Sequence, residues 1–235
     1  MPLVDKMPSE NWRKITNLIP HSLKLIVNKS LIAKDGKWLS LNQKISNYYD
    51  FIEKDIDKCL KIRMKIVNFF KLLSPNAINT NIAVSLMNLG ISYAEVDKFD
   101  ESEICYLKSI YMYELIYPNK THPDLAKNYL NLANTYNKVN KLEESEKFLI
   151  KSIEIYEKLY PTKFHPHLAI CYMGLAITYA GMNKLEESEK FHLKSVEIKE
   201  KIYSNTIHPD MASSYSSLAA TYYRMNKFEE SEHFI

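Results

Sequence analysis

The sequence predicts an all-α fold, a solenoid of antiparallel helix pairs. The segment "NKLEESEKF" occurs at 140–148 and again at 183–191, and variants of it occur at 97–105 and 226–234, so it returns every 43 residues. Apolar residues on both sides of each copy recur at the 3.6-residue spacing of an α-helix. A repeat of this length holds two helices that cannot bury their apolar faces alone, so successive copies must stack.

The composition is that of an ordered protein, with 46% hydrophobic and 25% charged residues and only 4 Gly and 9 Pro among 235 residues. The net charge of +3 has its basic excess in residues 1–78, which is too weak a bias to predict nucleic-acid binding. No segment is apolar enough to cross a bilayer, and the first residues lack the apolar core of a signal peptide. We expect a cytoplasmic protein without a membrane or nucleic-acid partner.

The first helix of a copy, helix A, is visible in residues 122–138. Its apolar stripe consists of Leu125, Tyr129, Leu132, Ala133 and Tyr136. Pro123 suits the first helical turn, and Asp124 suits the positive end of the helix dipole. The helical period breaks near Asn140, and asparagine tolerates the left-handed conformation that ends a helix. The pattern therefore predicts a tight turn at Asn140.

The second helix, helix B, follows that turn and ends at Tyr160, before Pro161. Its inward stripe consists of Leu142, Ser145, Leu149, Ser152, Ile153, Tyr156 and Leu159. The helix has about five turns. Ser145 is small enough to let the two helices approach closely. The repeated nonamer is thus the turn between helices A and B plus the first turns of helix B.

The order of Tyr129, Leu132, Ala133, Tyr136 and the following "NKLEES" resembles a tetratricopeptide repeat, and the long helix B is similar to the kinesin light chain type. The resemblance implies a right-handed superhelix with the helices A on its inner, concave wall. It places complete repeats at 79–121, 122–164 and 165–207, and an incomplete fourth at 208–235.

The N-terminal part is predicted to be helical as well. Residues 36–78 are predicted to form a degenerate, repeat-like helix pair. Alternatively, the basic and apolar segment 58–73 fits a membrane-surface or calmodulin-target helix. Residues 1–35 are expected to form a helical cap. They resemble the segment before such arrays in signalling ATPases of the NB-ARC type, but the sequence contains no GxxxxGK[ST] nucleotide-binding loop.

At the other end, Ile235 aligns with Leu149, so the fourth helix B stops after about two turns. An uncapped repeat leaves an apolar face in water. We therefore expect either a fragment of a longer array or a docking face for another chain, including self-association through the uncapped C-terminal repeat.

Several local motifs match known functional patterns, but each has a simpler structural interpretation. "HPD" at 122–124 and 208–210 matches the tripeptide of J-domain co-chaperones, but it recurs with the repeat and becomes "HPH" at 165–167, so we interpret it as a helix start. His165 and His167 lack further metal ligands at suitable spacing, and we expect exposed loop histidines and no metal site.

The three cysteines, Cys59, Cys105 and Cys171, are far apart and without CxxC spacing, which favours buried thiols. No Ser/His/Asp set, paired acids or Gly-rich phosphate loop can be assembled from the sequence. We expect no enzymatic activity and no cofactor.

The resemblance implies that a ligand lies on the concave wall. The inward positions of the helices A that we expect to contact a peptide are Met87, Asn88, Ile91, Lys127, Leu130, Asn131, Asn134, Asn137, Lys138, Met173, Ile177, Tyr223 and Arg224. In kinesin light chains an Asn before the "LA" pair holds the peptide backbone; Asn88 and Asn131 match it, whereas Gly174 and Ser217 depart. The alternative is that these side chains pack between adjacent helices A.

The leading hypothesis is a non-catalytic scaffold or adaptor that binds a protein or peptide segment with apolar anchors and a few acids. One alternative is the sensor portion of a larger NB-ARC-type signalling ATPase, which requires a nucleotide-binding loop. The other is a kinesin light chain-like cargo adaptor, which requires a heptad coiled coil that residues 1–78 do not show.

Overall fold

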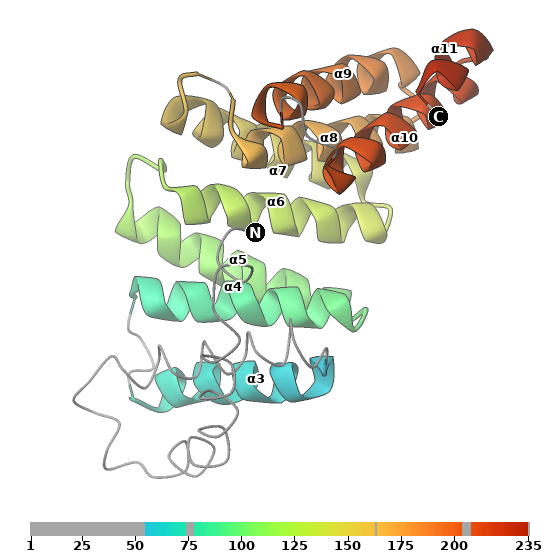
Figure 1. Ribbon diagram of the computed structural model, residues 1–235. Helices are drawn as coiled ribbons and strands as arrows, with labels where there is room; N and C mark the ends of the chain where they lie inside the picture. The colour runs from blue at the N-terminus through green and yellow to red at the C-terminus, as the bar shows by residue number, and fades with distance from the viewer. Residues whose placement is uncertain (1–54, 74–77, 163, 204–207, 235) are drawn as a thin grey trace, which may run out of the picture. The chain divides into compact units, whose positions relative to one another are not determined.

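The computed structural model describes residues 55–73, 78–162, 164–203 and 208–234 (Figure 1). The predicted cap at 1–35 and the first helix of the predicted pair at 36–78 lie outside the described residues. The chain divides into two compact units, residues 1–76 and 77–235, and each is described by itself.

In the first unit the structure describes one helix, α3 (Ile56–Leu73), in the segment where the sequence predicts a helix B. Cys59, Ile62, Ile66 and Val67 are buried at helical spacing. Asp55 precedes the helix and accepts a hydrogen bond from the backbone N–H of Lys58 at 3.0 Å, as an N-cap residue does. This segment is therefore an amphipathic helix with a buried side.

The second unit is a series of helix pairs. Its helices A are α4 (Thr80–Glu95), α6 (Pro123–Lys138), α8 (Pro166–Gly181) and α10 (Pro209–Arg224), and its helices B are α5 (Phe99–Ile116), α7 (Leu142–Leu159), α9 (Leu185–Ile202) and α11 (Phe228–His233). Each helix packs against the next along the chain. The described residues form no strand, so the predicted all-α solenoid of antiparallel helix pairs is confirmed.

Helices A of the later repeats begin at a histidine. The Nδ1 atoms of His122, His165 and His208 each accept the backbone N–H two residues later, at 3.2 Å. Each ring also stacks on the tyrosine that ends the preceding helix B, with ring centroids 3.6 Å apart for Tyr160 and His165. The expectation of an exposed loop histidine is wrong for His165, because capping and stacking half-bury the ring and burial lowers its pKa.

The turns between helices A and B follow the prediction. Asn140, Asn183 and Asn226 have φ angles of 58°, 59° and 61°, in the left-handed region, and Asp97 has the equivalent angle of 57° in the first pair. Short polar side chains tolerate this conformation better than other L-residues. The predicted tight turn at Asn140 is therefore confirmed.

Buried serines join the two helices of each complete pair. Ser109 donates to the backbone carbonyl of Ala83, Ser152 to that of Ala126, and Ser195 to that of Ala169, at 2.7–2.8 Å. The sequence analysis predicts close approach at another serine of helix B, Ser145, which is also fully buried. The structure adds that each hydroxyl satisfies its own hydrogen bond while it is buried.

Aromatic side chains join one repeat to the next. Phe148 packs between Tyr129 and Tyr136 of its own pair, with ring centroids 5.7 and 5.8 Å away. The Tyr129 hydroxyl then donates to Glu114 of the preceding helix B at 2.6 Å, and burial with this bond raises the pKa of Tyr129. Phe191 and Phe234 each pack against two tyrosines of their own pair in the same way.

The three cysteines are buried free thiols, as predicted. Within the described part of the chain, no helix is both long enough and apolar enough to cross a membrane. The same residues contain no group of three or more potential metal-ligating side chains.

Candidate functional site on the helices A

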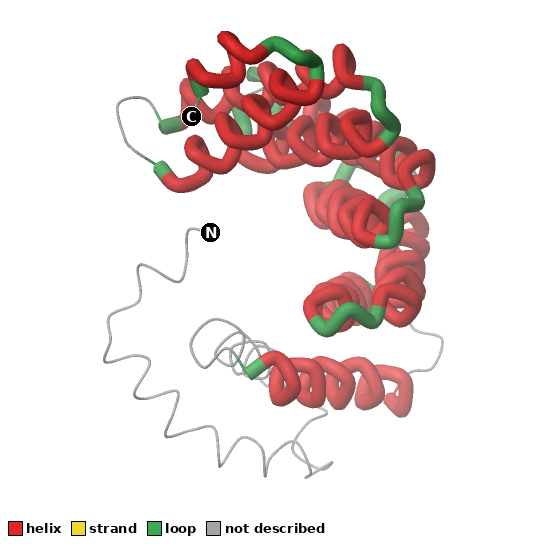
Figure 2. Tube along the Cα trace, turned by 90° about the vertical axis from the view of Figure 1, so that its right-hand side faces the viewer, coloured by secondary structure: helices red, strands yellow, loops and turns green. Residues whose placement is uncertain are grey.

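Successive helices A lie side by side, because α6 contacts both α4 and α8 (Figure 2). The Oγ1 of Thr178 on α8 donates to the Oδ1 of Asn137 on α6 at 3.0 Å. The outward sides of α6 and α8 therefore form one surface. We call it the helix A face and define it by Lys127, Asn131, Asn134, Lys138, Ile170, Met173 and Ile177.

The α6 half of this face is polar. Lys127, Asn131, Asn134 and Lys138 follow one another at helical spacing. Asn134 and Lys138 are exposed, whereas Lys127 and Asn131 are half-buried. The Nδ2 atom of Asn131 is buried and has no hydrogen-bond partner among the residues that the structure describes. A buried amide donor without a partner costs free energy, which a ligand carbonyl or carboxylate would offset.

The α8 half is apolar. Ile170 and Ile177 are 38% and 46% exposed, and Met173 between them is half-buried. Aliphatic and thioether side chains of this kind accept an apolar anchor of a ligand, and methionine adapts its shape to several anchors. The helix A face thus places a row of amide and ammonium donors beside a row of apolar contacts.

Two predicted site residues do not reach the surface. Met87 and Leu130 are only 3% and 5% exposed and belong to the main hydrophobic core. Each lies on a helix A that the next helix A packs against, so the neighbouring helix covers the side chain. This corrects their prediction as ligand-contacting residues. For these two positions the alternative of packing between helices A holds.

The remaining predicted residues of α4 and α6 have packing contacts of their own. Asn88 and Ile91 are half-buried, and Ile91 packs against the core. Asn137 is half-buried and engaged with Thr178. Lys138 lies 3.5 Å from the carbonyl oxygen of Ala94 and over the ring of Phe99. These contacts fix the positions of neighbouring helices as well as the shape of the face.

Tyr223 and Arg224 lie at the end of α10. Tyr223 is 64% exposed and meets the ring of Phe228 edge-on, with centroids 5.4 Å apart. The guanidinium of Arg224 donates to the Oδ1 of Asn183 at 3.3 Å. Both residues lie on α10, whereas the helix A face is defined on α6 and α8, so we treat them as separate from it.

The expectation of an exposed loop histidine is also wrong for His167. His167 is half-buried in the first turn of α8, and in the described part of the chain its buried Nδ1 atom has no hydrogen-bond partner. Burial lowers the pKa of His167, with smaller contributions from His165 and from the Lys127 ammonium. The departure of "HPH" from "HPD" was the available signal, since Asp124 and Asp210 of the two neighbouring repeats are replaced by histidine at this position.

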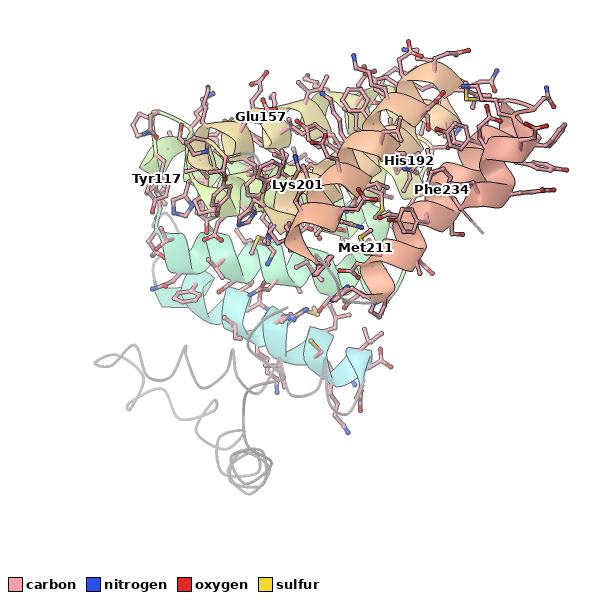
Figure 3. All side chains as sticks on the ribbon, turned by 45° about the horizontal axis from the view of Figure 1, so that its top comes forward. Tyr117, Glu157, His192, Lys201, Met211 and Phe234 are labelled. Carbon is pink, nitrogen blue, oxygen red and sulfur yellow. The ribbon has the colours of Figure 1, made fainter. Side chains whose placement is uncertain are left out.

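A cavity of about 310 Å³ lies elsewhere, between the ends of α7 and α8 and the helix α9. Its walls include Phe164 and Tyr172, whose rings are already faced by Lys201 and Lys194 at 4.2 and 5.1 Å. Figure 3 labels Glu157, which lines this cavity, and Lys201. Because a lysine of the chain already lies over each of these two rings, we do not include the cavity in the candidate site.

Comparisons with known proteins agree with this architecture. A family model described as tetratricopeptide repeat matches residues 81–158 and 124–201, and a second model with that description matches residues 211–235. No curated protein matches the sequence.

Several solved structures share the fold. BtubC (BKLC) from P. vanneervenii is 14% identical, with 95% of this chain and 86% of that chain covered and a TM-score of 0.76. A Podosopora anserina putative kinesin light chain with nearly identical TPR-like repeats is 15% identical, with 86% and 93% covered and a TM-score of 0.71. MamA from Desulfovibrio magneticus RS-1 is 14% identical, with 86% and 93% covered and a TM-score of 0.58. At these identities the likeness shows the fold alone.

Proposed function

The chain belongs to the tetratricopeptide repeat family, and we propose that it is a non-catalytic scaffold of the cytoplasm that binds a peptide or protein segment on the helix A face. The observation that supports this proposal most is the packing of α6, which carries the polar row, beside α8, which carries the apolar row. Recognition of an extended or helical segment needs both kinds of contact, since apolar pockets supply affinity and polar groups fix the register.

The ligand that fits this surface carries one or two aliphatic side chains and at least one acid. The aliphatic side chains pack on Ile170, Met173 and Ile177, which are exposed or half-buried. The Asn131 amide donates to a backbone carbonyl, and the Lys127 ammonium attracts the acid. Lys138 is exposed on the same row and provides a second positive charge on α6 for the acid of the ligand.

The proposal is tested with a variant that changes only the polar row, Lys127→Glu, Asn131→Ala and Asn134→Ala. Proteins captured from native lysate by the wild-type chain are identified, and their segments are titrated as synthetic peptides against both chains. We expect at least about tenfold weaker binding by the variant, because it loses a buried donor and reverses one charge. Circular dichroism verifies equal helicity.

The matched control is Lys147→Glu, which makes the same single charge reversal at an exposed position of a helix B. It should bind as the wild type does. If the polar-row variant and the wild type bind the same peptides equally, the helix A face is not the binding site.

A further inference from the structure

The outer side of α5 carries an exposed apolar row. Ile104, Leu107, Tyr111 and Leu115 are 51%, 41%, 60% and 46% exposed. Their spacing places them in one line along the helix, about 16 Å long at 1.5 Å per residue. We call these four residues the α5 stripe. Single exposed apolar residues are normal, but a line of four on one helix is a contiguous patch.

The equivalent positions of the other helices B show that the fold does not require this stripe. In α7 they are occupied by Lys147, Ile150, Glu154 and Lys158, and in α9 by Lys190, Leu193, Glu197 and Lys201. Each of these helices has one apolar residue where α5 has four. Because the same pair geometry forms with charged residues there, packing within the repeat does not explain the α5 stripe.

The charges around the stripe indicate the chemistry of a partner. Asp100 and Glu101 are exposed in the first turn of α5, at one end of the stripe, whereas Glu114 near the other end is already paired with Lys120 at 3.5 Å. Lys108 is the single basic residue of the helix, whereas α7 carries lysines within the row itself. An apolar line with two exposed acids at one end complements an amphipathic helix that has an apolar line with Lys or Arg beside it.

A second copy of the chain fits this surface less well. Two α5 stripes packed in parallel would bring Asp100 and Glu101 of one copy against those of the other, and like charges held together at an interface are unfavourable. An antiparallel pair would offer these acids no basic residue of α5 other than Lys108. We propose that the α5 stripe docks a basic amphipathic helix of a different protein. This site is separate from the helix A face, because it lies on a helix B.

The test uses a synthetic peptide of about 18 residues, with leucines at i, i+3, i+4 and i+7 spacing bordered by lysines. Its controls are a scrambled peptide of the same composition and a twin in which glutamate replaces each lysine. The chain variant is Ile104→Lys, Tyr111→Glu and Leu115→Lys, which gives α5 the outer residues of α7 and therefore a surface that the fold accepts.

We expect the wild type to bind the basic peptide at least about tenfold more tightly than the variant does, and more tightly than it binds either control peptide. The reverse exchange on α7, Lys147→Ile, Glu154→Tyr and Lys158→Leu, should raise the stoichiometry from one peptide to two. The polar-row variant of the helix A face should bind the peptide normally, so that failure of this inference and failure of the proposed function are distinguished.

Three results would overturn the inference. One is equal binding of the basic peptide by the wild type and the α5 variant. Another is equal binding of the lysine and glutamate peptides by the wild type. The last is a wild-type dimer in sedimentation velocity that becomes a monomer in the α5 variant, which would assign the stripe to a second copy of the chain.

Discussion

The junction between α7 and α8 and the junction between α9 and α10 have the same arrangement of helices but different chemistry at two buried positions. In α7 these positions are Leu149 and Tyr156, which are 0% and 1% exposed. In α9 they are His192 and Lys199, which are 2% and 5% exposed. One backbone geometry thus accommodates an apolar pair and a titratable pair.

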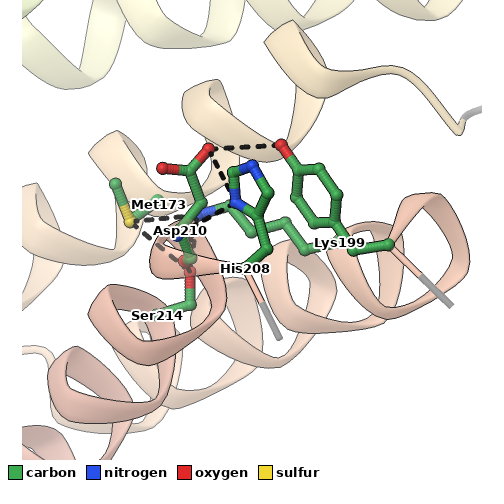
Figure 4. Close-up of polar contacts among 6 residues, drawn as sticks. Met173, Lys199, His208, Asp210 and Ser214 are labelled. Atoms are coloured by element: carbon green, nitrogen blue, oxygen red, sulfur yellow. Dashed lines mark hydrogen bonds and ion pairs between the residues drawn. The ribbon is translucent and has the colours of Figure 1, made fainter. Parts of the chain in front are cut away.

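The partners of Lys199 explain how it is accommodated. Its Nζ donates to the Oγ of Ser214 at 2.6 Å and to the backbone carbonyl of Asp210 at 3.1 Å (Figure 4). Burial lowers the pKa of Lys199, and the nearby Asp210 carboxylate opposes this shift. In α7 the equivalent hydroxyl of Tyr156 lies 3.5 Å from the carbonyl oxygen of Pro123.

The apolar cores of the two junctions also differ. Leu149 and Tyr156 belong to the main core, which extends from Ala83 to Ile198, whereas Val196, Leu218 and Tyr222 form a separate small cluster. A smaller apolar core with two buried titratable groups gives less stabilisation. The comparison therefore indicates that α10 and α11 form the less stable end of the described array. The stability of this end depends on pH.

The largest effect should come from transferring the lysine to the first junction. Tyr156→Lys removes a fully buried aromatic ring and buries an ammonium among apolar groups, so we expect a loss of about 3–5 kcal/mol in the free energy of unfolding. Urea unfolding followed by circular dichroism measures it. A loss below about 1 kcal/mol would show that this position tolerates lysine without the partners found near α10.

A smaller effect should come from the titration of His192. Burial, with the Lys199 charge, lowers the pKa of His192 to about 4 from 6.5. Because the folded state binds fewer protons than the unfolded state between these values, the stability from this residue is lost as the pH falls from 6.5 toward 4. Between pH 7 and pH 5 the loss should be roughly 2 kcal/mol.

His192→Leu checks this prediction, because it gives α9 the residue of α7 at that position. Urea unfolding at pH 7 and pH 5 should show a smaller pH dependence in the variant than in the wild type. The comparison with the variant is needed, since burial also lowers the pKa values of His165 and His167. The same pH dependence in both chains would contradict the assignment to His192.

The smallest effect should come from restoring the tyrosine at the second junction. Lys199→Tyr replaces a buried amine by the residue found at both equivalent positions, Tyr113 and Tyr156. The Tyr113 hydroxyl donates to Asp124, and Asp210 offers the same carboxylate in the fourth repeat. We expect a gain of about 1–2 kcal/mol in the stability of the α9–α10 junction, measured by native-state hydrogen exchange of α10. Reduced protection of α10 would contradict it.

The helices and turns were predictable from the sequence because they depend on local patterns. The 3.6-residue period, Pro123 at the helix start and Asn140 in the turn each act within one repeat. All four copies share the period, and three of them share the proline and the asparagine. The exchange of Tyr156 for Lys199 is visible in the same alignment. The burial of Lys199 is predictable from its position in the repeat. Its hydrogen-bond partners are not predictable in this way.

The exposure of individual site residues was not predictable in this way. Met87, Leu130 and Met173 occupy the same position of helix A, yet the first two are buried and Met173 is half-buried. The difference depends on how closely the next helix A covers the position, which is a tertiary property. The histidine caps were also missed, because Ser, Thr, Asp and Asn are the usual N-cap residues.

The most direct test of the proposed function is photo-crosslinking from two exposed positions. A photoreactive phenylalanine analogue is placed at Asn134, on the helix A face, or at Lys147, on the outer side of α7, and the chain is irradiated in native lysate. The proposal predicts a discrete adduct from position 134 and none from position 147. Adducts of equal yield from both positions, or an adduct from position 147 alone, would contradict binding on the helix A face.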